Sequence, residues 1–166
     1  MTEAEKKLRQ EWRTPDDFFR VLDDEFHFDI DVCANLENRK CGDYISRERN
    51  ALADDCEWFN IRHRSAFCNP GFNNILPWIH KAYEETRKKP NSVAVVLGLC
   101  APSAAWFQYA VEVAEEVRLL RPRVQYFLLG VKNSSNPREC AMFIFRDGLG
   151  INDNQRIVHW NWKPKP

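Results

Sequence analysis

The stretch from Asn91 to Cys100, NSVAVVLGLC, decides the fold class. After its polar start it stays apolar for the length of a strand, without the alternation that marks a strand with one face in water. Continuous apolar runs of this kind are typical of strands buried on both faces of a parallel sheet. We therefore predict a strand here, in an α/β sandwich with helices on both faces of the sheet.

The segments before this strand begin with a helix pattern at residues 15–26. Thr14 is the expected N-cap, Pro15 takes the first helical position, and acidic residues fill the first turn. Apolar and polar residues then alternate over residues 26–34, which predicts a strand. The polar, irregular residues 35–64 predict loops and short elements.

A second short strand is expected at Ser65 to Cys68, followed by a helix. Proline at position 77 is tolerated only near a helix start, so this helix should begin near Asn73 or Asn74. Beyond the central strand, Ser103 is the expected cap of a helix at residues 104–117.

The C-terminal part has mostly strand patterns. They cover residues 117–120, 124–129, 140–146 and 155–160, with a turn-rich segment at 130–139. The chain therefore predicts a mostly parallel central sheet with an antiparallel C-terminal end.

Length and composition predict one domain. The chain has 166 residues, of which 44% are hydrophobic and 29% charged, values ordinary for a globular protein. We expect a charged extension at 1–12, a single domain at 13–162 and a tail at 163–166. The charged start and the lack of a run of ~18 apolar residues predict a cytoplasmic protein that does not enter membranes. We expect a monomer or a homodimer, since no feature of the sequence selects between them.

The six cysteines are spread along the chain without a Cys-x-x-Cys pair. A zinc site built from Cys33, Cys41, Cys56 and Cys68 is conceivable, but their spacing is wide and irregular. We interpret the cysteines as free thiols and expect no metal.

Charge is balanced overall, with 24 basic and 24 acidic residues. One basic stretch, however, runs from residue 117 to 138 without an acidic residue. Its members are Arg118, Arg121, Arg123, Lys132 and Arg138. This stretch could contact phosphates, or it could be a solvated rim that balances nearby glutamates.

The turn Asn69-Pro70-Gly71-Phe72 follows the second predicted strand. In open α/β sheets, ligands bind beyond the carboxyl ends of the strands, so this turn and residues 31–34 are expected to face one crevice. Asn69 offers an amide acceptor, Pro70 a carbonyl acceptor and Phe72 an aromatic face, a set suited to an exocyclic amine on a base. The alternative is a plain Pro-Gly turn between strand and helix.

The chain resembles the phage-type DNA N6-adenine methyltransferase family, within the S-adenosylmethionine-dependent amino-methyltransferases. The family's amino-group motif is Asn or Asp, then Pro-Pro, then an aromatic residue, here NPGF. The resembling segments, in the family's order, are TPDDFFRVLDDEFHFDIDVCANLENRKCGDYI (14–45), RNAL (49–52), Trp58, NPGF (69–72), WIHKA (78–82), VAVVLGLCAPSAAWF (93–107) and RLLRPRVQYF (118–127).

This resemblance implies a Rossmann-like methyltransferase fold, S-adenosylmethionine as cofactor and a flipped adenine in DNA as substrate. The implied catalytic residues are Asn69, Pro70, Gly71 and Phe72, with Phe72 also stacking on the base. The implied cofactor-binding residues are Thr14, Pro15, Asp31, Cys33, Ala34 and Asn50. DNA contacts are expected from Arg123 and Lys132, and sequence choice from the loop at 130–139.

Gly71 departs from the family motif, because it replaces the second proline. Glycine loses the restriction of φ that proline supplies, so the turn is less preorganised. One alternative is therefore a methyltransferase-like protein that binds DNA or cofactor with weak or no catalysis. Another is transfer to a different amine, cytosine N4 or a protein glutamine amide.

Overall fold

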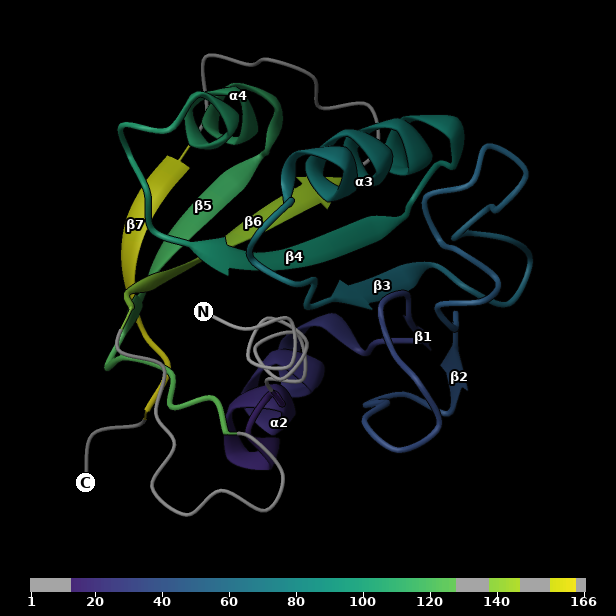
Figure 1. Ribbon diagram of the computed structural model, residues 1–166, viewed down its shortest axis with the longest axis horizontal. Coiled ribbons are helices and arrows are strands. Elements are labelled where there is room, and N and C mark those ends of the chain that lie inside the picture. The colour runs from purple at the N-terminus through teal and green to yellow at the C-terminus, as the bar shows by residue number, and fades with distance from the viewer. Residues whose placement is uncertain (1–12, 128–137, 147–155, 164–166) are drawn as a thin grey trace, which may run out of the picture.

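A seven-stranded mixed sheet forms the centre of the computed structural model, which describes residues 13–127, 138–146 and 156–163 (Figure 1). Its strands are β1 Ile30–Asp31, β2 Asp43–Tyr44, β3 Ser65–Cys68, β4 Val93–Leu99, β5 Glu116–Arg121, β6 Cys140–Arg146 and β7 Arg156–Asn161. Their order across the sheet is β2-β1-β3-β4-β6-β5-β7. Among these strands only β6, between β4 and β5, runs against the others. The predicted α/β fold is confirmed, with its antiparallel strand in the C-terminal part.

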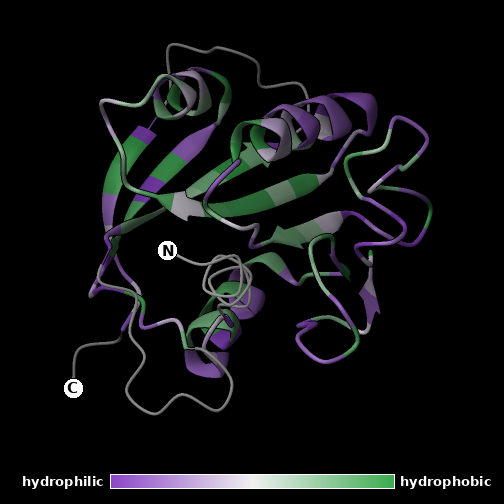
Figure 2. Ribbon diagram, in the orientation of Figure 1, coloured by the Kyte–Doolittle hydropathy of each residue, from purple (hydrophilic) through white to green (hydrophobic). Residues whose placement is uncertain are grey.

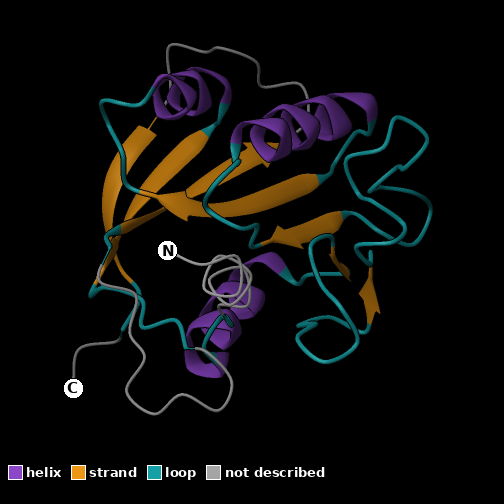
Figure 3. Cartoon of the chain, viewed as in Figure 1, coloured by secondary structure: helices purple, strands orange, loops and turns teal. Residues whose placement is uncertain are grey.

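Helices cover both faces of this sheet, as Figures 1 and 3 show. Helix α2, Asp16–Phe26, lies on one face, and α3, Leu76–Lys88, and α4, Ala105–Val113, lie on the other. In the described ranges, no helix has the length and apolar character needed to cross a membrane.

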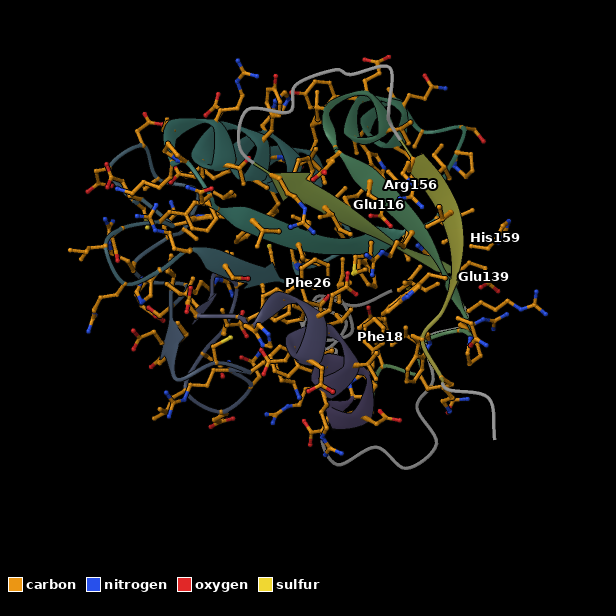
Figure 4. The ribbon with its side chains drawn as sticks, turned by 180° about the vertical axis from the view of Figure 1, so that it is seen from behind. Phe18, Phe26, Glu116, Glu139, Arg156 and His159 are labelled. Atoms are coloured by element: carbon orange, nitrogen blue, oxygen red, sulfur yellow. The ribbon has the colours of Figure 1, made fainter. Side chains whose placement is uncertain are left out.

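Strand β4 separates two apolar clusters, because successive side chains of a strand point to opposite faces. Ala94 and Val96 pack with Ile79 of α3 on one face, whereas Val95 and Leu97 pack with Phe18 of α2 on the other. Figure 2 shows this strand as mostly hydrophobic along its length, and Figure 4 shows α2 against the sheet with Phe18 and Phe26 labelled. The two-sided burial predicted from the apolar run is confirmed.

Gly98 lets the chain before α3 approach β4 closely. A Cβ atom at this position would lie 2.5 Å from the Cδ1 atom of Ile75 and 3.2 Å from a ring carbon of Phe143. A side chain here would force the Ile75 Cδ1 atom, the far end of a flexible side chain, to move aside.

Several local predictions were wrong. The N-cap of α2 is Pro15 rather than Thr14, and that of α4 is Ala104 rather than Ser103, and neither cap residue makes a side-chain capping hydrogen bond. Helix α3 starts at Leu76, later than expected, with proline in its first turn. Residues 124–127 form no strand; among them only Phe127 makes an isolated bridge, with Arg13, and residues 128–129 lie outside the described ranges.

Arg118 is not part of a solvated basic patch. Its side chain is 9% exposed and forms ion pairs with Glu25 at 2.5 Å and with Glu116 at 2.8 Å. The guanidinium also lies over the rings of Phe26 and Trp160. Arg118 therefore ties α2 to the face of β5 and β7 and is unavailable to a phosphate.

Candidate functional site

The turn from Asn69 to Phe72 leaves the sheet at the carboxyl end of β3, beside the end of β1. The two strands pair in parallel, with Asp31 opposite Phe67, and the Val32 N–H donates to the Phe67 carbonyl at 2.9 Å. The two segments predicted to share a crevice therefore leave the sheet side by side.

A pocket of about 380 Å³ opens at this edge. Cys33, Ala34 and Asn50, which the family resemblance assigns to the cofactor, line it together with Gly71 of the turn. The other lining residues are Val32, Asn35, Asn38, Ile45, Ser46, Arg47, Ala51, Asn73, Asn74 and Trp78. The turn that carries Asn69 thus contributes one wall of this pocket.

The pocket lining is rich in amides. Asparagines 35, 38, 50, 73 and 74 each offer both donors and acceptors, and Ser46 adds a hydroxyl. Arg47 brings a positive charge, Trp78 an indole ring, and none of the described lining residues is acidic. Such a lining suits a ligand that combines a planar heterocycle with both donor and acceptor groups.

Asp31, also assigned to the cofactor by the resemblance, is 3% exposed and does not line the pocket, but it bonds to the loop that does. Its carboxylate accepts from the backbone N–H of Cys33 at 3.2 Å and of Lys40 at 3.0 Å. Burial raises the pKa of Asp31 to about 6, against the opposing effect of these two hydrogen bonds. Asp31 thereby closes the loop that presents Cys33 and Ala34 to the pocket.

Asn50, another lining residue of the pocket, sits in a tight turn. Its φ of 59° is left-handed, a conformation that asparagine adopts more readily than most residues. Its backbone N–H donates to the Ser46 carbonyl at 3.1 Å, and its Oδ1 accepts from the Leu52 N–H at 3.2 Å. This geometry places Asn50 and Ala51 at the pocket surface.

A buried ion pair on α3 bonds to the backbone of the segment that follows Asn50. Lys81 and Glu85 are 7% and 3% exposed, and their charged groups lie 3.3 Å apart. Glu85 accepts from the Trp58 backbone N–H at 2.9 Å, and Lys81 donates to the Ala53 carbonyl at 3.1 Å. The Trp58 indole N–H in turn donates to the Ala51 carbonyl at 2.9 Å, which links the pair to the pocket lining.

Asn69 is half-buried, and its amide is held by Thr14. Its Nδ2 atom donates to the Thr14 hydroxyl oxygen at 2.9 Å. Thr14 is 3% exposed and does not line the pocket, nor does its neighbour Pro15. The contact joins the segment before α2 to the turn after β3.

The other two members of the turn differ in exposure. Pro70 is buried, whereas Phe72 is partly exposed. The Phe72 ring packs edge-on against Tyr126, with ring centroids 5.9 Å apart and an interplanar angle of 79°. Tyr126 is fully buried, so the contact fixes the Phe72 ring and leaves part of it accessible.

A larger hollow of about 500 Å³ lies between α2 and the loop at residues 37–40. Its charged side chains largely pair with one another, Lys40 with Asp16 at 2.5 Å and Arg13 with Glu37 at 3.6 Å. Because these four charged side chains already pair, and because Cys33, Ala34, Asn50 and Gly71 line the smaller pocket, we place the candidate ligand site there.

Of the two residues expected to contact DNA, the structure describes Arg123, which does not line the pocket. Arg123 is exposed and pairs with Glu139 at 2.8 Å, and Lys132 lies outside the described ranges, as does most of the loop at 130–139. The Arg123–Glu139 pair sits where β5 ends and β6 begins, at the same edge of the sheet as Asn69.

The cysteines considered for zinc do not form a metal site. In the described ranges, no three His, Cys, Asp or Glu side chains come together to hold an ion, and none of the six cysteines forms a disulfide. Burial raises the pKa of Cys33 to about 12 and that of Cys68 above its usual range. Both are therefore neutral thiols beside the turn.

Sequence reasoning missed three features of this site. Asn73, Asn74 and Trp78 were assigned only to a helix, yet they line the pocket directly after the turn. The Thr14–Asn69 bond joins segments far apart in the sequence, and no local pattern predicts it. The buried Lys81–Glu85 ion pair was missed as well. The sequence did contain a signal for this ion pair, because a lysine and a glutamate stand four positions apart on the apolar face of a helix.

A mostly parallel sheet covered on both faces, with a pocket beyond the strand ends, defines an α/β protein of the methyltransferase-like class. The family described as DNA N-6-adenine-methyltransferase (Dam) matches residues 1–157, and the chain belongs to this family.

Two phage proteins illustrate the similarity. The chain is 29% identical over 116 residues to the DNA N-6-adenine-methyltransferase of Haemophilus phage HP1, and 26% identical over 117 residues to that of Escherichia phage T1. These alignments cover 69% and 70% of this chain, and 64% and 47% of the relatives. The chain thus matches less than two thirds of the length of either relative.

Proposed function

We propose that this protein transfers a methyl group from S-adenosylmethionine to the N6 amine of a flipped adenine in DNA. The proposal rests on one observation, that the turn carrying Asn69 also forms part of the pocket lining. Gly71 lines the pocket, and Asn69, Pro70 and Phe72 stand on the same turn. A methyl donor in the pocket and an amine at the turn would be close neighbours, and the names of the phage relatives support this chemistry.

The pocket residues fit the proposed cofactor. A volume of about 380 Å³ lies within the range of roughly 300–1,000 Å³ typical of small-molecule sites. Trp78 offers an aromatic surface to a purine, the asparagines offer hydrogen bonds, and Arg47 offers a charge to a carboxylate. When bound, S-adenosylmethionine supplies an activated methyl group on a sulfonium.

The turn then holds and orients the amine. Asn69 Oδ1 and the Pro70 carbonyl accept its two N–H groups, which directs the nitrogen lone pair out of the plane of the base. Phe72, fixed against Tyr126, stacks on the base with its accessible surface. The protein contributes orientation and electrostatic stabilisation, and none of its side chains needs to form a covalent intermediate.

DNA phosphates would meet the basic residues where β5 and β7 end and β6 begins. Arg121, Arg123, Arg138 and Lys163 are exposed there, and Glu139 is the neighbouring acid. Figure 4 shows Glu139 near this end of the sheet and Arg156 at the opposite end of β7. The residues lie at the edge from which the Asn69 turn emerges.

The salt dependence of DNA binding tests this surface. Replacing Arg123 with alanine should weaken binding to all sequences and reduce the slope of log K against log salt by about 0.9, the value for one phosphate contact. Fluorescence anisotropy with a labelled duplex measures both quantities. Arg156→Ala, at the other end of the sheet, is the matched control and should leave the slope unchanged; equal slopes for both variants and the wild type would place the DNA elsewhere.

The activity itself is tested by incubating the protein with labelled S-adenosylmethionine and unmethylated DNA, followed by nucleoside mass spectrometry. We expect N6-methyladenine. N4-methylcytosine, or label in protein glutamine, would reassign the acceptor. Cofactor binding without any methylated product would contradict the proposal and favour the binding protein suggested by Gly71.

A further inference from the structure

Thr14 is held in place independently of Asn69. On one side, Arg13 and Phe127 exchange backbone hydrogen bonds of 2.8 and 3.3 Å. On the other side, α2 begins at Asp16, and the Pro15 carbonyl accepts from the Phe19 N–H at 2.9 Å. The Thr14 backbone is therefore anchored from both directions, and its buried hydroxyl is a fixed point for whatever it contacts.

The hydroxyl contacts the group on which the proposed chemistry depends. Asn69 Nδ2 donates to Thr14 Oγ1 at 2.9 Å, which leaves the amide oxygen on the side away from Thr14. An amide can present either its oxygen or its nitrogen to a ligand, and only the oxygen can accept from an amine. The hydroxyl does not cap the helix and does not line the pocket. We therefore assign it the role of holding the Asn69 amide.

We propose that Thr14 is a positioning residue, which orients the Asn69 amide so that its oxygen faces the substrate amine. This inference rests on the proposed function, and it differs from the role in cofactor binding that the family resemblance implies. A hydroxyl can accept from an amide and can also donate to a carboxylate. The same threonine would therefore orient either Asn or Asp at position 69.

Two variants separate the hydroxyl from the shape of the side chain. Thr14→Val is isosteric but lacks the hydroxyl, and Thr14→Ser keeps it. We expect Thr14→Val to lower kcat about 10-fold, as loss of one orienting hydrogen bond would. The Kd for S-adenosylmethionine and the KM for DNA should stay within about twofold of wild type, and Thr14→Ser should retain most of the wild-type kcat.

The dependence on Asn69 is measured by combining substitutions. In an Asn69→Ala background, Thr14→Val should cause no further loss, because the group that it orients is gone. A further loss in this background, or a raised Kd for S-adenosylmethionine with unchanged kcat, would make Thr14 a cofactor ligand and overturn the proposal. A wild-type kcat for Thr14→Val would also overturn it.

A readout without catalysis keeps this inference separate from the proposed activity. In nitrogen-15 spectra, the side-chain amide signal of Asn69 is identified by its loss in Asn69→Ala. Thr14→Val should shift this signal and speed its hydrogen exchange, whereas Thr14→Ser should not. An unchanged signal in Thr14→Val overturns the positioning role, whereas a shifted signal in a protein without methylation activity overturns only the proposed function.

Discussion

Replacing Asn69 with alanine is expected to lower kcat for adenine methylation by about 10²–10³-fold, the typical cost of one preorganised hydrogen bond in a transition state. Alanine removes the side-chain oxygen proposed to accept from the amine and leaves only the Pro70 carbonyl. Because Asn69 does not line the pocket, cofactor affinity should change little. Single-turnover methylation assays and calorimetric titration with S-adenosylmethionine measure the two effects separately.

Asn69→Asp sharpens this prediction, since aspartate keeps an acceptor at the same place and the Thr14 hydroxyl can turn to donate to it. We expect this variant to lose less activity than Asn69→Ala. The control is Gln108→Ala, which removes an exposed amide on α4, and it should match the wild type. If Asn69→Ala methylates adenine as fast as the control, the amine is held by other groups.

Strands β3 and β4 could be predicted because apolar runs in the sequence indicate their burial. Strand β2 was not predicted, and β1 is shorter than the predicted 26–34. Strand β3 has the predicted bounds, and β4 follows the apolar run, since a strand covered on both faces must be apolar throughout. The helix starts were harder. Thr14 and Ser103 are residue types that cap helices, but the Thr14 hydroxyl instead accepts a hydrogen bond from Asn69. Helix α4 begins at Ala105, with Ala104 rather than Ser103 as its N-cap.

The order of the strands predicted which segments meet at the candidate site, but not the side-chain contacts within it. Two segments that follow neighbouring strands were expected together, and the pairing of β1 with β3 brings them together. The basic stretch at 117–138 was less informative, because strand geometry turns alternate residues in opposite directions. Arg118 is buried among carboxylates and aromatic rings, whereas Arg121 and Arg123 are exposed.

Replacing Glu85 with leucine is expected to lower the free energy of unfolding by about 3–5 kcal/mol, the usual cost of breaking a buried ion pair by removing one partner. The buried Lys81 ammonium would lose its carboxylate partner, and the Trp58 N–H would lose its acceptor. Urea unfolding followed by tryptophan fluorescence measures the change. Since Trp58 also bonds to Ala51 at the pocket, affinity for S-adenosylmethionine should fall as well.

The double variant Lys81→Met, Glu85→Leu tests whether the uncompensated charge causes this loss. It leaves no buried ammonium, so the remaining cost should be about 1–3 kcal/mol, from the Trp58 N–H without a partner. Lys88→Ala removes the exposed neighbour of Glu85 and should cost less than about 1 kcal/mol. If the single and double variants are equally unstable, the lost contact with the loop matters more than the charge. The Lys81–Glu85 ion pair would then act only by positioning Trp58, and affinity for the cofactor should fall equally in the single and the double variant.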